Sequence, residues 1–233
     1  MSNGYFQFRQ FTVYQDRCAM KVGTDGVLLG AWADVESAHT VLDVGTGTGL
    51  IALMVAQRGT ARVTAVEVDE SSAEQARENV EASPWKERIA VHHCRVQDFE
   101  CTEPFDVIVS NPPYFKQSLK SPAAGRTLAR HTDSLSYEDL LTAVDRLLAE
   151  NGAFSVILPY SEKDNFLQLA KKHQLCCRWL VEILPTPTSQ PKRFLAEFRR
   201  LEDEVVLSQL VIEEGGRHQY SEDYKQLTKE FYL

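Results

Sequence analysis

The sequence predicts an α/β domain in which helices cover both faces of a central, mostly parallel sheet of seven or eight strands. Two observations predict this fold. From Thr40 onward, short apolar runs alternate with helical patterns, which is typical of repeated βα units. Closely spaced glycines follow the first apolar run, where a strand turns into a helix. We therefore expect one domain over residues 1–233, with 1–39 as a lead-in and 40–233 as the core.

Five apolar runs are expected to form the parallel strands. Their nearly continuous apolar character suits strands that are covered on both faces. They are Val41–Val44, Val63–Val68, Ile89–His92, Phe105–Val109 and Phe154–Leu158. The helices expected between them are Leu50–Arg58, Glu70–Ala82, Tyr137–Ala149 and Glu162–Lys172. Ser136 and Asp139 resemble a capping box, and Ser161 is expected to open the last helix in a similar way.

The pattern changes after residue 174, where three strand-like runs follow one another with no helix between them. These runs are Leu175–Leu184, Arg193–Arg200 and Val205–Ile212, joined by a proline-rich turn and an acidic turn. Hairpin pairing of neighbouring runs predicts antiparallel strands at the edge of the sheet.

Composition and termini exclude several classes of protein. The net charge is −8 and 43% of residues are hydrophobic, as in an ordinary globular chain. No apolar run approaches the roughly 18 to 20 residues that span a bilayer, and the first residues lack the regions of a signal peptide. The five cysteines include no C-x-x-C pair, so neither a disulfide framework nor a metal site is indicated. A cytoplasmic location is expected.

Positive charge is concentrated locally although the chain is acidic overall. Residues 111–132 carry four cations and no acid, and a second basic stretch covers residues 192–200. Charge runs are usually solvated faces, but the first one adjoins a candidate active site. The candidates for phosphate contacts with a nucleic acid are Lys116, Lys120, Arg126 and Arg130, and His131 is a further candidate for contact with the same substrate.

The glycine run at residues 41–51 reads VLDVGTGTGLI. Gly45, Gly47 and Gly49 would let the backbone approach a ligand closely, beside the unpaired N–H groups of a helix N-terminus. A dinucleotide fold uses the spacing G-x-G-x-x-G, whereas here the spacing is G-x-G-x-G with Asp43 two residues ahead. This pattern favours a cationic nucleoside ligand over a pyrophosphate. A tight strand-to-helix turn without a ligand is the alternative.

Acidic residues follow the next two strands. Glu67 and Asp69 come at the tip of the second strand, where a carboxylate can accept both hydroxyls of a ribose. The alternative is a charge that stabilises the following helix N-terminus. Asp98 follows the third strand and could accept the adenine amino group of the same ligand, or it could be a solvated loop residue.

The tetrapeptide after the fourth strand is Asn111-Pro112-Pro113-Tyr114. Two prolines remove backbone donors and restrict the backbone, which makes a rigid corner. A planar –NH2 group could donate its two N–H bonds to the Asn111 side-chain oxygen and the Pro112 carbonyl. That orientation would aim the nitrogen lone pair at an electrophile, and Tyr114 could stack on the ring that carries the amine.

With these motifs the chain resembles the amino-methylating group of class I S-adenosylmethionine methyltransferases, which have a Rossmann-like fold. Residues 11–13 and 16–32, with Arg126–His131 and Phe231–Leu233, resemble the bacterial tRNA-valine adenine-N6 methyltransferases. Those enzymes modify the purine on the 3′ side of the anticodon. The resemblance implies S-adenosylmethionine as cofactor, tRNA as substrate and catalysis by Asn111, Pro112 and Tyr114. We expect a monomer, because no feature demands a dimer.

The same resemblance implies a role for each candidate cofactor-binding residue. The residues Lys21, Thr24, Asp25, Asp43 and Gly45 would surround the methionine end of the cofactor. Glu67 would hold the ribose and Asp98 the adenine, with Gly47, Gly49 and Asn111 completing the site.

Three other functions stay open at this point. Methylation of a glutamine amide in a protein such as a release factor presents a similar –NH2 group, but such enzymes usually carry a separate helical N-terminal domain. DNA adenine methylation would usually require a target-recognition domain or a large insertion. A non-catalytic RNA-binding module that holds S-adenosylmethionine is the third alternative.

Overall fold

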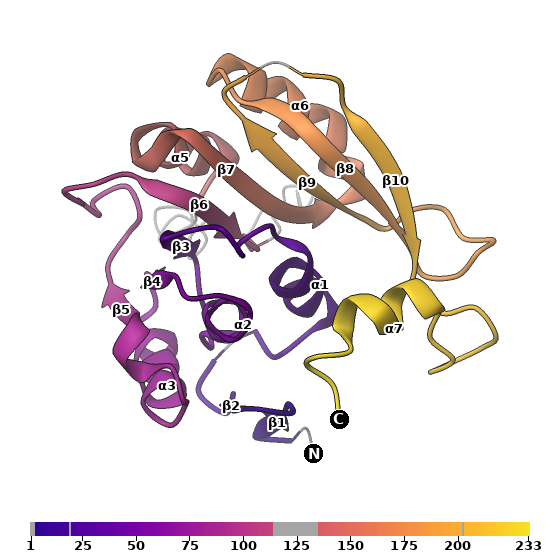
Figure 1. The fold of residues 1–233 in the computed structure, drawn as a ribbon, viewed down its shortest axis with the longest axis horizontal. Helices are drawn as coiled ribbons and strands as arrows, with labels where there is room; N and C mark the ends of the chain where they lie inside the picture. Colours follow the sequence, from indigo (N-terminus) through magenta and orange to yellow (C-terminus); the bar gives the residue numbers. More distant parts are fainter. Residues whose placement is uncertain (1–2, 19, 114–134, 202) are drawn as a thin grey trace, which may run out of the picture.

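The computed structural model describes residues 3–18, 20–113, 135–201 and 203–233. Its main sheet has eight strands in the order β10-β8-β9-β7-β6-β3-β4-β5 (Figure 1). Five of them form a parallel block: β3 (Thr40–Val44), β4 (Arg62–Glu67), β5 (Ile89–His93), β6 (Phe105–Ser110) and β7 (Leu148–Pro159). The five strands expected from the apolar runs are confirmed.

Helices cover both faces of this sheet. One apolar cluster packs residues of α1 (Thr24–Trp32), α2 (Leu50–Arg58) and α7 (Glu222–Thr228) against one face. A second cluster packs α5 (Tyr137–Leu147) and α6 (Lys163–Lys172) against the other. The helix α3 (Glu70–Glu81) lies beside β4 and β5, and short 3-10 turns occupy Lys86–Arg88 and Tyr160–Glu162. The predicted arrangement with helices on both faces is confirmed.

Three helix boundaries differ from the predictions. The helix α3 ends at Glu81, one residue before the predicted end, and Ala82 is its C-cap. The capping box of Ser136 and Asp139 is present, but α5 ends two residues early because Leu148 already begins β7. Ser161 does not cap α6. It lies within a 3-10 turn, and α6 begins at Lys163 after Glu162, whose side chain makes no capping bond.

The C-terminal strands confirm the predicted antiparallel pairing of the first two runs and correct the prediction for the third. The strand β9 (Arg193–Arg199) is antiparallel to its two neighbours, β7 and β8 (Cys176–Leu184). Both edges of β9 are therefore occupied, so β10 (Val206–Val211) cannot form a hairpin with it. Instead β10 crosses over and pairs in parallel with β8 at the edge of the sheet.

The lead-in forms a small sheet of its own, with β1 (Tyr5–Gln7) antiparallel to β2 (Thr12–Tyr14). It meets the other end of the chain, since the Arg9 N–H donates to the Phe231 carbonyl at 2.9 Å. The Phe8 ring is fully buried and stacks on Tyr232 at 6.0 Å between centroids. The two ends of the chain therefore lie side by side below α1 and α2 (Figure 1).

Candidate active site

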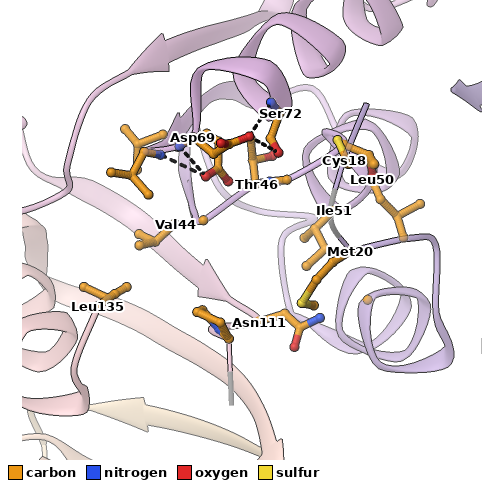
Figure 2. A pocket seen from close by; sticks show the side chains of 18 of the residues that line it. Cys18, Met20, Val44, Thr46, Leu50, Ile51, Asp69, Ser72, Asn111 and Leu135 are labelled. Carbon is orange, nitrogen blue, oxygen red and sulfur yellow. Dashed lines mark hydrogen bonds between the residues drawn. The ribbon is translucent and has the colours of Figure 1, made fainter. Parts of the chain in front are cut away.

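A cavity of about 560 Å³ opens at the carboxyl ends of the parallel strands β3, β4 and β6. This volume lies within the range of roughly 300–1,000 Å³ that is typical of small-molecule sites. Asp69 and Ser72 gather at one side of the cavity and Asn111 lies at the other (Figure 2). The lead-in forms a wall, contributing Cys18 and residues 20–26.

The glycine loop forms the floor of the cavity. Gly45, Gly47 and Gly49 have φ values of +73°, +56° and +81°, which favour glycine strongly. A Cβ atom on Gly45 or Gly47 would meet nothing within 4 Å, so both leave open space for a ligand. Gly49 does not line the cavity. It precedes α2 and packs against Ala76, which a Cβ atom would approach to 3.5 Å.

Asp43 lies beneath this loop and does not line the cavity. Its side chain is fully buried, and Oδ2 accepts hydrogen bonds from the Thr46 hydroxyl at 2.5 Å and the Ala52 N–H at 3.1 Å. Oδ1 has no hydrogen-bond partner among the described residues. Burial raises the pKa of Asp43 to about 7, although the Thr46 and Ala52 bonds oppose this. A cation bound above the loop would offset the cost of this buried charge.

The raised pKa of Asp43 predicts a pH-dependent contribution to stability. A folded-state pKa above the unfolded value of 3.8 gives stabilisation that is complete below pH 3.8 and is lost as the pH rises to about 7. Compared with Asp43→Asn, the wild type should lose up to roughly 4 kcal/mol of unfolding free energy as the pH rises across that window. Urea titrations of both proteins at pH 5 and pH 8 measure most of this loss, and a difference that is independent of pH would contradict the prediction.

Glu67 reaches the cavity from the end of β4 and is only 9% exposed. Its Oε1 accepts the N–H groups of Val68 and Asp69, both at 2.9 Å, and its Oε2 accepts the Gly47 N–H at 2.8 Å. A carboxylate has about four acceptor positions, so this arrangement leaves one on Oε2 for a ligand hydroxyl. Bidentate contact with a ribose would require the Gly47 N–H to turn away.

Asp69, unlike Glu67, is the N-cap residue of α3. Its Oδ1 accepts the Ser72 N–H at 2.8 Å and the Ser72 hydroxyl at 2.7 Å, which caps the N-terminus of α3. The structure therefore separates the two acids that the sequence left as alternatives: Asp69 caps the helix, and Glu67 supports the glycine loop.

The loop after β5 lines the cavity through a residue that sequence analysis missed. Val96 and Gln97 line it, whereas the Asp98 side chain is 70% exposed and lies beside Arg95. Arg146 of α5 holds this loop by donating to the carbonyls of Phe99 at 2.7 Å, Val96 at 3.0 Å and Gln97 at 3.3 Å. Gln97 is thus better placed than Asp98 to meet a ligand.

The predicted cofactor-binding residues of the lead-in lie at the cavity. Lys21, Thr24 and Asp25 all line it, at and just before the N-terminus of α1. Asp25 Oδ2 accepts a hydrogen bond from Arg193 Nε at 2.8 Å, so the first cation of β9 supports the lead-in. Gly26 faces the catalytic candidate, since a Cβ atom there would lie 3.9 Å from Asn111 Nδ2 and 3.0 Å from Leu50.

The candidate catalytic corner begins where β6 ends. Ser110 ties this end to β3, because its buried hydroxyl donates to the Val44 carbonyl at 2.9 Å. Asn111 and Pro113 line the cavity, while Pro112 is buried. Several predicted residues lie outside the described part of the chain: Tyr114, Lys116, Lys120, Arg126, Arg130 and His131.

Other cavity-lining residues carry no motif. Cys94 and Leu135 line the cavity, and only their position in the fold reveals them. The described residues contain no group of three or more histidine, cysteine or acidic side chains arranged for a metal ion. Among them there is also no helix long and apolar enough to cross a membrane.

Comparison with known proteins agrees with this geometry. Residues 21–159 match the methyltransferase small domain family. The chain is 55% identical to the tRNA1(Val) (adenine(37)-N6)-methyltransferase of Phocaeicola vulgatus, covering 100% of this chain and 99% of that protein. The enzyme of the same name from Bacteroides thetaiotaomicron is 49% identical, again over 100% and 99%.

Solved structures support the fold. A predicted O-methyltransferase from Agrobacterium tumefaciens superposes with a TM-score of 0.69 at 21% identity, covering 89% of this chain and 96% of that one. A TehB-like SAM-dependent methyltransferase from Corynebacterium glutamicum gives 0.51 at 18% identity, covering 77% and 89%. The resemblance predicted from the glycine loop, the Asn-Pro-Pro corner and the lead-in is confirmed. The chain belongs to the methyltransferase small domain family and to that of the tRNA1(Val) (adenine(37)-N6)-methyltransferases.

Proposed function

We propose that this protein transfers a methyl group from S-adenosylmethionine to the exocyclic N6 of an adenine in tRNA, at position 37 of tRNA1(Val). One observation carries the proposal: Asn111 and Pro113 open into the same cavity as the glycine loop and Glu67. A floor suited to a nucleoside and a candidate acceptor for a planar amine therefore line one cavity. The names of the full-length relatives support the choice of tRNA.

The cavity fits a cationic nucleoside. Open space above Gly45 and Gly47 admits a ligand close to the backbone, and the buried Asp43 carboxylate below the loop favours positive charge. Glu67 would hold the ribose, with Gln97 near the base and Lys21, Thr24 and Asp25 around the amino-acid end. When bound, S-adenosylmethionine supplies an electrophilic methyl group on a positively charged sulfur.

The residues of this chain contribute chiefly by positioning the acceptor. The Asn111 side-chain oxygen and the Pro112 carbonyl would accept hydrogen bonds from the two N–H groups of the adenine amine. They would hold its nitrogen in position to attack the methyl carbon. These acceptors would also stabilise positive charge developing on that nitrogen. The proton is then lost to water, because alkylation makes the nitrogen acidic, so no dedicated base is required.

Access of the adenine and binding of the tRNA rest on residues around the cavity. Bases in an anticodon loop can be splayed out and stacked on aromatic side chains, as Tyr114 is predicted to do. Phosphate contacts by the basic segment at residues 111–132 stay a prediction. The second basic stretch is largely occupied within the protein, since Arg193 pairs with Asp25, Arg199 with Glu197 and Arg200 with Asp145. The single domain, the monomer and the cytoplasmic location also stay predictions.

The proposal is tested by transfer of tritium from labelled S-adenosylmethionine to tRNA that lacks this modification. Nucleoside analysis should find the label in N6-methyladenosine, and purified tRNA1(Val) should be the preferred acceptor. A transcript with guanosine in place of adenine 37 should accept no label. Cofactor binding without labelling of tRNA would contradict the assigned substrate, and label in a release factor would support the glutamine-amide alternative.

A further inference from the structure

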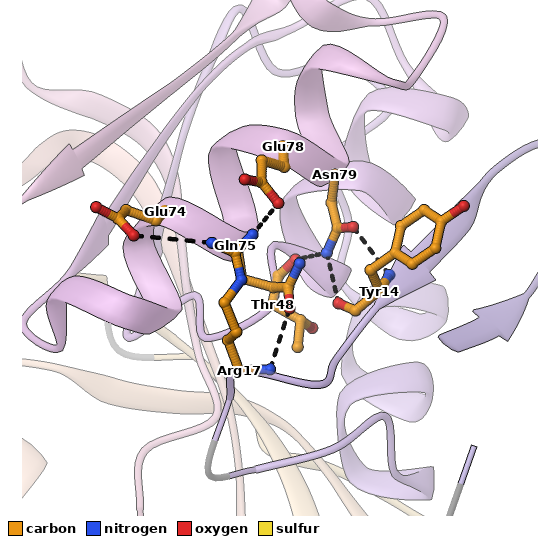
Figure 3. A network of polar contacts seen from close by, with 7 residues as sticks. All are labelled: Tyr14, Arg17, Thr48, Glu74, Gln75, Glu78 and Asn79. Atoms are coloured by element: carbon orange, nitrogen blue, oxygen red, sulfur yellow. Dashed lines mark hydrogen bonds and ion pairs between the residues drawn. The ribbon is translucent and has the colours of Figure 1, made fainter. Parts of the chain in front are cut away.

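A group of polar side chains on α3 holds the lead-in against the glycine loop (Figure 3). Asn79 and Gln75 lie one turn apart on the same face of this helix, and each is 1% exposed. Long polar side chains are rarely this buried unless hydrogen bonds satisfy them. The hydrogen-bond partners of Asn79 and Gln75 therefore indicate the role of these two amides.

The Asn79 amide binds two separate segments of the chain. Its Oδ1 accepts the Tyr14 N–H at 2.8 Å, and its Nδ2 donates to the Tyr14 carbonyl at 2.8 Å. The side chain thus pairs with the end of β2 as a neighbouring strand would. The second Nδ2 hydrogen goes to the Thr48 carbonyl, also at 2.8 Å. Thr48 belongs to the glycine loop and lines the cavity.

The next contacts continue toward the cavity. Gln75 Oε1 accepts the Arg17 N–H at 3.2 Å, and the Arg17 guanidinium contacts the carboxylates of Glu74 and Glu78. Gln15, itself 6% exposed, closes the following turn because its Oε1 accepts the Val22 N–H at 2.8 Å. These bonds set the path of the segment that reaches Cys18, Met20 and Lys21 on the cavity wall.

We infer that Asn79 is a positioning residue for the cofactor. It acts by joining the lead-in wall of the cavity to the glycine-loop floor. The inference rests on the proposed binding of S-adenosylmethionine in this cavity. Asn79 bonds to the wall-bearing segment and to the floor, and among the described residues no bond joins it to Asn111, Pro112 or Pro113. Its loss should therefore weaken cofactor binding more than it slows methyl transfer in the assembled complex.

The test compares Asn79→Ala with wild-type protein. Asn79→Ala should raise the Kd and the KM for S-adenosylmethionine about tenfold, because it removes buried bonds and leaves their backbone partners unsatisfied. The kcat at saturating cofactor should stay within about twofold of wild type. Deuterium uptake should rise over residues 14–22 and stay unchanged at β6. The control is Glu81→Ala on the exposed end of α3, which pairs with Lys86 and should leave all four readouts unchanged.

Two further comparisons keep the outcomes distinct. Gln75→Ala removes one hydrogen bond of the same group, so it should also raise the Kd for S-adenosylmethionine, but less than Asn79→Ala does. If Asn79→Ala fails to fold, Gln75→Ala provides the test. If the folded variants bind S-adenosylmethionine with the same Kd as the wild-type protein, the positioning role of Asn79 is wrong. A fall in kcat at unchanged Kd would also overturn it. Wild-type protein that bound no S-adenosylmethionine would instead contradict the proposed function.

Discussion

Replacing Asn111 by alanine is expected to lower kcat for methylation of tRNA by about 100- to 1,000-fold, the usual effect of removing one preorganised electrostatic contact. Asn111 directly follows β6 and lines the cavity opposite Asp69 and Ser72 (Figure 2). Its proposed partner is the adenine amine, so binding of S-adenosylmethionine should change little. Single-turnover tritium transfer measures the chemical step, and calorimetry with S-adenosylmethionine measures binding.

Two variants sharpen this test. Asn111→Asp keeps an acceptor oxygen at the same position and should retain more activity than Asn111→Ala. Asn151→Ala removes an amide from an exposed position of β7 that does not line the cavity, and it should behave as wild type. If Asn111→Ala lost cofactor binding together with turnover, the division of labour between the Asn-Pro-Pro corner and the glycine loop would be wrong.

Replacing Glu67 by alanine is expected to weaken cofactor binding by about 10- to 100-fold, since hydrogen bonds to charged groups contribute about 1.5–3 kcal/mol each. The carboxylate is proposed to support the ligand in two ways. One acceptor position remains for a ribose hydroxyl, and the other three hold the N–H groups of Gly47, Val68 and Asp69 in place. The Kd for S-adenosylhomocysteine, measured by calorimetry, reports both effects without turnover.

The matched control is Glu70→Gln, three residues further on in the first turn of α3, where the side chain is exposed and outside the cavity. It should bind the cofactor normally. Glu67→Gln is expected to fall between wild type and Glu67→Ala, because an amide keeps one acceptor oxygen but directs N–H donors at backbone donors. A Kd for Glu67→Ala equal to that of wild type would remove Glu67 from the cofactor site.

Much of the fold and the main site motifs could be predicted from local sequence. Apolar runs and glycine spacing depend on residues close together in the chain, and the five parallel strands and the helix Leu50–Arg58 appear where those patterns predict. The Asn-Pro-Pro corner directly follows β6, so its position relative to Gly45 follows from the pairing of β3 with β6. Parallel strands bring their carboxyl ends to one edge, which is why motifs about 60 residues apart meet.

Other features were decided by tertiary structure, because they depend on which partners remain available. Nothing local to residues 205–212 indicates that both edges of β9 are occupied, so the parallel pairing of β10 with β8 follows only from the assembled sheet. Burial was decided in the same way. Gln97 rather than Asp98 lines the cavity, and Asn79, which carries no motif, joins the lead-in to the glycine loop. The sequence by itself determined which chemistry the chain carries, whereas packing between distant segments decided which polar groups are buried and which line the cavity.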